Sequence, residues 1–173
     1  MRNKTSVGVV VACLVGVLCL SSCDPNQDQI VKIVAKTAGT VAAQGWILIN
    51  NPDPVVLSQV TNILGIVKEK AVEVSEGETY VDAMYPELAT IIDNQVDEQY
   101  QYLCKMGVLV MLTQLDALFI QYPEWKKTES TVIAVVVSFV DGANQVFGMT
   151  EDNPIRSILV LTNKKKNAML LAD

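Results

Sequence analysis

Apolar residues recur at intervals of three and four along most of this chain, and this spacing is the feature that most restricts its fold. Such intervals place apolar side chains on one face of an α-helix. In residues 54–74 this face contains Val56, Val60, Ile63, Val67 and Val74. Similar patterns predict further helices over residues 30–49, 79–96, 98–122 and 128–147, and from residue 154 onwards. We therefore expect an all-α protein, in which residues 30–173 form a single-domain bundle of five to six helices.

Prolines and polar residues mark where these helices start and stop. Asp53 can cap the helix that begins at Pro54, because proline suits the first helical position. Pro86 lacks a backbone N–H and its ring clashes with the preceding turn, so we expect a short helix, a kink or break at Tyr85-Pro86, and a second helix from Pro86. Residues 132–137 have a strand-like composition. Intervals of three and four nevertheless continue through this segment and favour a helix.

The segment 98–122 is apolar nearly all round, which is typical of the central helix of a bundle. A membrane-spanning helix is the alternative. Gln114 and Asp116 near its middle, and Lys105 near its start, are unfavourable in lipid, so we prefer the bundle. If Asp116 is buried, it must pair or become protonated. We expect it to bond a neighbouring helix or to lie at a solvent-facing edge.

The first 23 residues have the order of a secretory signal. Arg2 and Lys4 come first, residues 7–20 are apolar, and small residues then lead into Cys23. The apolar run is shorter than the roughly 20 residues that a spanning helix needs. We therefore expect residues 1–22 to be removed as a signal peptide.

The sequence Leu20-Ser21-Ser22-Cys23 resembles the lipobox of bacterial lipoproteins. The resemblance implies that Cys23 carries a diacylglyceryl group and anchors the chain to a membrane, facing the periplasm. Residues 23–29 would then be the lipidated cysteine and a short tether. Asp24 resembles the signal that retains enterobacterial lipoproteins in the inner membrane, which weakly favours that membrane over the outer one. A cleaved signal with an unmodified Cys23 is the alternative.

The remaining composition excludes several classes of protein. After loss of the signal, 11 basic and 19 acidic residues leave a net charge of −8, which disfavours nucleic acid as a partner. The chain has no histidine, so imidazole catalysis and histidine-ligated metals are excluded. With Cys23 lipidated, Cys104 is the one cysteine left, so we expect no disulfide and a buried thiol. We expect no cofactor and no metal.

Acidic residues concentrate between Glu69 and Glu98. A calcium site or a catalytic carboxylate pair is the functional interpretation, and Asp93 and Asp97 would share a helix face. The alternating acids and glycine of a calcium loop are missing, so we expect a solvated helix face.

Two features suggest contact with a partner. Ala35, Gly39 and Ala43 are spaced by four, which allows another helix to approach closely, either within the bundle or from outside. Trp125 lies in an expected loop beside Lys126 and Lys127, where an exposed ring would contact lipid or protein.

These observations favour a non-enzymatic envelope lipoprotein that acts by binding another envelope protein. It would be an accessory or pilot of an envelope assembly, or an exclusion factor of a phage or plasmid; the sequence leaves its oligomeric state open. One alternative is a small peptidoglycan-active enzyme, with Glu87 as the nominal carboxylate. The other is a membrane-embedded protein of the lysis type, spanning the bilayer with residues 103–120.

Overall fold

The computed structural model describes residues 27–74 and 77–148. They form α2 (Gln27–Asn50), α3 (Pro54–Glu69), α4 (Tyr80–Gln95), α5 (Glu98–Gln121), the short 3₁₀ helix η1 (Pro123–Lys126) and α6 (Glu129–Phe147). No strand occurs in these two ranges, and the predicted all-α class is confirmed. The signal peptide, Cys23, Asp24 and the helix expected from residue 154 lie outside the described residues.

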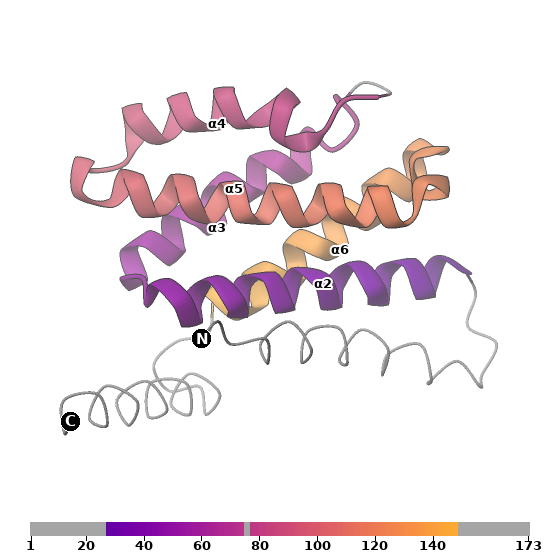
Figure 1. The fold of residues 1–173 in the computed structure, drawn as a ribbon, viewed down its shortest axis with the longest axis horizontal. Helices are drawn as coiled ribbons and strands as arrows, with labels where there is room; N and C mark the ends of the chain where they lie inside the picture. Colours follow the sequence, from indigo (N-terminus) through magenta and orange to yellow (C-terminus); the bar gives the residue numbers. More distant parts are fainter. Residues whose placement is uncertain (1–26, 75–76, 149–173) are drawn as a thin grey trace, which may run out of the picture.

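The long helix α5 runs between α4 and α2, with α3 and α6 behind it (Figure 1). It packs against α4, α2 and α3, as its apolar composition predicts for a central helix. Its buried side chains include Val108, Met111, Leu112, Leu115 and Phe119. Gly107 lets the indole of Trp46 approach α5, because a Cβ at this position would lie 2.8 Å from Cζ2 of that ring.

Helices α2 and α6 cross with their backbones in contact. A Cβ added at Gly39 would overlap the carbonyl oxygen of Phe139, and one added at Gly142 would overlap the carbonyl oxygen of Lys36. The hydroxyl of Thr40 lies 3.2 Å from the carbonyl oxygen of Gly142 and so links the two helices. Two glycines on facing helices therefore set how close this crossing is.

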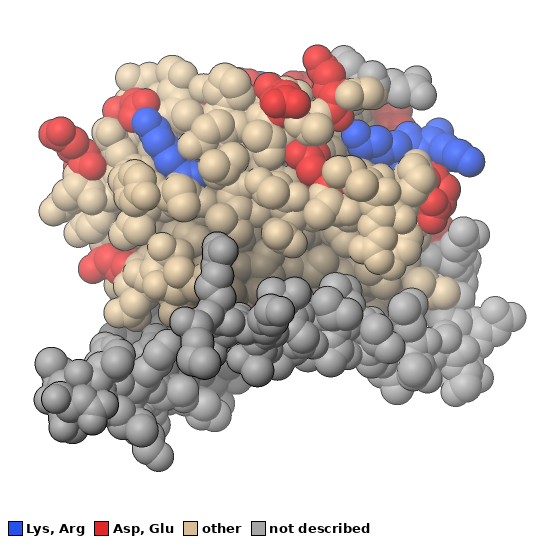
Figure 2. All heavy atoms as spheres, in the orientation of Figure 1, with Lys and Arg blue, Asp and Glu red and all other residues tan. Residues whose placement is uncertain are grey.

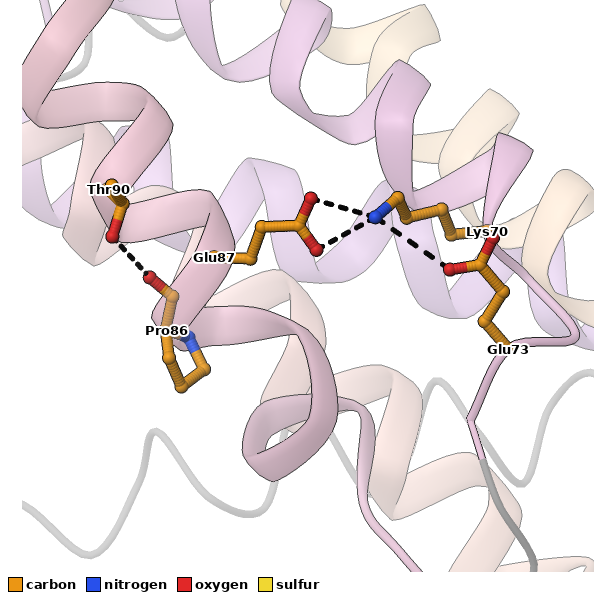
Figure 3. Close-up of polar contacts among 5 residues, drawn as sticks. All are labelled: Lys70, Glu73, Pro86, Glu87 and Thr90. Carbon is orange, nitrogen blue, oxygen red and sulfur yellow. Dashed lines mark hydrogen bonds and ion pairs between the residues drawn. The ribbon is translucent and has the colours of Figure 1, made fainter.

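Helix α4 runs without a break from Tyr80 to Gln95, so the expectation that a second helix begins at Pro86 after a break is wrong. Pro86 is exposed, and the carbonyl that its missing N–H leaves free can bond water on this side of the helix. The carbonyl of Pro86 itself accepts a hydrogen bond of 2.9 Å from the hydroxyl of Thr90 (Figure 3). Packing of the buried face of α4 on both sides of Pro86, which includes Met84 and Leu88, stabilises the continuous helix.

Helix α3 ends at Glu69, five residues before the expected residue 74. The hydroxyl of Tyr80 donates a 2.6 Å hydrogen bond to the carbonyl oxygen of Ala71, and this bond holds the chain in a turn. Gly77 supplies the left-handed backbone conformation, with φ of 91°, that the reversal before α4 requires.

Candidate functional site

Asp116 is buried in α5 and binds the start of α4. Its carboxylate oxygens accept the backbone N–H groups of Tyr80 at 2.7 Å and Val81 at 3.0 Å. These are two of the donors that a helix N-terminus leaves without intrahelical partners. Asp116 therefore bonds a neighbouring helix, which was one of the two arrangements expected, and its carboxylate faces the positive end of the α4 dipole.

A third such donor at this end of α4 is also occupied. The Asp82 N–H donates to the Thr79 hydroxyl at 3.0 Å, and the Ala83 N–H makes the first regular bond of the helix, to the Thr79 carbonyl oxygen at 3.0 Å. The Tyr80 ring stacks on Phe119 of α5 with centroids 5.5 Å apart, and burial, followed by the charge of Asp116, raises the pKa of Tyr80. These bonds give Asp116 a structural role at the start of α4.

Trp125 is only 6% exposed, so the expectation of an exposed ring at this position is wrong. Its ring stacks on Tyr122 with centroids 4.2 Å apart, and η1 packs against α5 and α6. The 3₁₀ turn that follows Pro123 folds the ring back onto the bundle and leaves the lysines beside it exposed. Trp125 is therefore a core residue and not a contact for a partner.

The small-residue face of α2 is also used inside the bundle. Ala35 and Ala43 are fully buried, and Gly39 meets the backbone of α6. The prediction that this face admits another helix is confirmed, and that helix is α6. Because α6 occupies the face, these three residues are not available to an external partner.

Several acidic residues between Glu69 and Glu98 form surface ion pairs. Lys70 donates to both carboxylate oxygens of Glu87, at 2.7 and 2.8 Å, and so joins the end of α3 to α4 (Figure 3). Its bond to Glu87 is the main cause that raises the pKa of Lys70. Lys105 similarly binds Asp93 at 2.6 Å. Within the described ranges no group of three or more potential metal ligands is present.

Cys104 is a free, fully buried thiol on α5. Burial raises its pKa to about 11, so the thiolate that nucleophilic chemistry needs is disfavoured. The expectation of a buried, small, hydrophobic cysteine is confirmed.

One side of α5 is exposed and uncharged, which the sequence interpretation missed. Tyr102 is 71% exposed and Ile120 is 77% exposed, and they lie five helical turns apart on the same side. Between them this side carries Met106, Leu109, Thr113 and Ala117, all half-buried or exposed. We call these six residues the α5 face. In Figure 2 the area over α5 is mostly free of charged side chains, which gather toward α4 and the two ends of the bundle.

The sequence does contain a signal for the α5 face, because its six residues are spaced by three and four and so lie on one side of the helix. The apolar character all round the helix instead suggested full burial. By length and composition α5 and α6 could each cross a membrane, yet about half of the apolar window of each, 50% and 44%, is buried inside the bundle. Core helices of a bundle have this composition too.

Comparison with known proteins assigns no family. Neither the protein-family models, nor the curated proteins, nor the solved structures contain a match to this chain.

Proposed function

We propose that this protein is a lipid-anchored component of a bacterial envelope that acts by binding another protein through the α5 face. The lipobox-like sequence that ends in Cys23 supports the anchor. The α5 face is the observation that supports binding. It extends over about 27 Å, from 18 residues at 1.5 Å each, and carries a strongly exposed aromatic and an aliphatic side chain at its two ends.

An exposed apolar surface of this kind is unfavourable unless a partner covers it, since contiguous apolar patches on soluble domains commonly mark interaction sites. Tyrosine and methionine are enriched in protein interfaces, whereas charged residues are depleted in their centres. The α5 face has this composition. A partner that docks here would be an envelope assembly that the protein assists, or a component of an incoming phage or plasmid that it excludes.

The two carboxylates considered for catalysis or structure, Glu87 and Asp116, both bond other parts of the bundle, which favours a binding protein over an enzyme. Glu87, the nominal carboxylate of an enzyme, has both oxygens bonded to Lys70 and serves as a link between two helices. Asp116 caps α4.

Cross-linking and capture from native membranes test the proposal. The wild-type chain should capture a discrete envelope protein, and Cys23→Ser should lose it because the anchor is gone. Tyr102→Arg and Ile120→Arg should lose the same partner while the lipid, checked by mass spectrometry, stays in place. Val55→Arg on α3 is the matched control, because Val55 is also an exposed aliphatic residue outside the α5 face.

The proposal fails at separate points in this experiment. A mature chain without lipid on Cys23 refutes the anchor. Capture of the same partner by the two α5 variants and by wild type refutes the α5 face. Release of muropeptides from purified peptidoglycan by the protein would establish the enzymatic alternative.

A further inference from the structure

Helix α2 has a second apolar stripe on the side opposite its buried face. Val31, Ala35, Gly39, Ala43 and Trp46 form the buried face, and α6 and α5 pack against α2. The opposite side follows intervals of three and four and contains Ile30, Ile33, Thr37, Val41, Gln44 and Leu48. We call these six residues the α2 stripe. Ile33 is 54% exposed and Leu48 is 43% exposed, and the stripe contains no charged residue.

A shallow hollow of about 250 Å³ forms part of this side and is lined by Ile33, Lys36, Thr37 and Thr40. Pockets that enclose small molecules usually exceed roughly 300 Å³. The hollow is therefore a dent in the α2 stripe rather than a ligand cavity, and it suits an occupant that adapts to an uneven surface.

Charge is divided between the two edges of the bundle. On α2 the exposed Lys32 and Lys36 outnumber the one acid, Asp28. Eight described acids lie between residues 69 and 98: Glu69, Glu73, Glu78, Asp82, Glu87, Asp93, Asp97 and Glu98. Most of them belong to α4 and the segments that flank it, and α4 forms the edge opposite α2 (Figure 1). An anionic surface would attract the α2 edge and repel the α4 edge.

A lipid on Cys23 would place the start of α2 close to a bilayer. Cys23 precedes Gln27, the first residue of α2, by four residues. Four residues span at most about 14 Å, even when fully extended. A lipid on Cys23 therefore holds the start of α2 next to the headgroups, where the α2 stripe can reach them.

We propose that α2 lies in the plane of the bilayer surface, with Ile30, Ile33, Val41 and Leu48 inserted at the boundary between headgroups and acyl chains. This inference rests on the lipid anchor of the proposed function. An amphipathic helix of this type inserts its apolar side by roughly 5–10 Å. Lys36, which lines the hollow beside Ile33 and Thr37, extends its aliphatic stem along the helix and brings its ammonium group to lipid phosphates. The bundle is thereby oriented, with the acidic edge directed away from the membrane.

Fluorescence quenching in vesicles tests this orientation. The lipidated full chain is reconstituted into vesicles of phosphatidylethanolamine and phosphatidylglycerol whose acyl chains are brominated. The variants Ile33→Trp and Val41→Trp place an indole on the α2 stripe, and Ala83→Trp places one at an exposed position of α4 as the matched control. The native Trp46 and Trp125 are buried and contribute a background that the wild-type protein measures.

Insertion to roughly 5–10 Å should remove about half or more of the emission added at positions 33 and 41, and leave that at position 83 almost unchanged. All variants should keep the wild-type melting temperature, because the substituted side chains are exposed. Equal emission from the stripe variants in brominated and ordinary vesicles overturns the proposal.

Other occupants of the α2 stripe give different results. Emission of Ile33→Trp that is blue-shifted without vesicles, and loses this shift on dilution, identifies a second copy of the chain. A blue shift that persists on dilution identifies residues 149–173 of the same chain. Either result without quenching overturns the membrane contact. A chain without lipid on Cys23 refutes the anchor together with this inference, whereas a lipidated chain without quenching refutes the orientation alone.

Discussion

Removal of the Asp116 carboxylate should destabilise the bundle more than the loss of any surface charge. Its oxygens accept the N–H groups of Tyr80 and Val81 at 2.7 and 3.0 Å, and its side chain is only 8% exposed. A hydrogen bond to a charged group contributes about 1.5–3 kcal/mol. A negative charge at a helix N-terminus adds about 0.3–1 kcal/mol. Because water can relieve part of the loss at Val81, we expect Asp116→Ala to lower the free energy of unfolding by about 3 kcal/mol.

Asp116→Asn keeps one carbonyl oxygen in the same place but turns the other acceptor into a donor. It should therefore lose about 2 kcal/mol, since one N–H of α4 then faces an amide NH₂ group. A total stability of about 5–15 kcal/mol makes both losses large enough to measure by urea unfolding of the lipid-free chain from residue 24.

The control is Asp93→Asn, which removes an exposed ion pair with Lys105 and should change the stability by less than about 1 kcal/mol. Hydrogen exchange locates the effect, because the amides of Tyr80 and Val81 should lose protection in Asp116→Ala before the rest of α4 does. A loss in Asp116→Ala no larger than that in Asp93→Asn would refute the capping role.

Three further outcomes follow from packing and burial. Gly142→Ala forces its Cβ into the backbone of Lys36 and should lower the unfolding free energy by about 2 kcal/mol in urea titrations. Gly45→Ala, with open space at its Cβ, should instead raise it by about 0.5–1 kcal/mol. Trp125→Ala should lower it by about 3 kcal/mol, because the ring is buried against Tyr122. Burial raises the pKa of Cys104 from 9.0 to about 11, so folding favours the thiol and this contribution is lost as the pH rises between these values. The stability of wild type relative to Cys104→Ala, measured at a series of pH values, should fall over that range.

The fold could be predicted from the sequence where local signals and packing agree. Intervals of three and four located all five described α-helices, and the cap at Asp53 is present, with its side chain bonded to the N–H of Val55 at 2.8 Å. The strand-like composition of residues 132–137 did not mislead, because these residues lie in α6. The spacing of apolar residues indicates which helix face is buried, and the packing of that face outweighs the β-propensity of individual residues.

The sites were harder to predict because they depend on contacts between segments distant in the chain. Nothing near Trp125 in the sequence indicates that η1 folds its ring back onto Tyr122. Asp116 and Tyr80 are 36 residues apart, so their bond follows only from the antiparallel packing of α4 on α5. The small-residue spacing of α2 correctly indicated close helix approach, but not whether the approaching helix belongs to the same chain.

Pro86 shows how packing overrides a local helix breaker, and it provides a measurement of that effect. A proline in a helix interior lowers the free energy of unfolding by about 3 kcal/mol relative to alanine. Proline also restricts the unfolded chain, and this effect raises the free energy of unfolding by about 0.4–1 kcal/mol. Because α4 stays continuous across Pro86, the bundle must absorb the difference. Pro86→Ala restores the missing N–H and should raise the free energy of unfolding by about 2 kcal/mol. Pro54→Ala is the matched control with the opposite sign, because Pro54 is the first residue of α3 and loses no intrahelical bond there. Urea unfolding at an unchanged m-value measures the stability change of each variant. A Pro86→Ala variant no more stable than wild type would refute the argument that Pro86 destabilises α4.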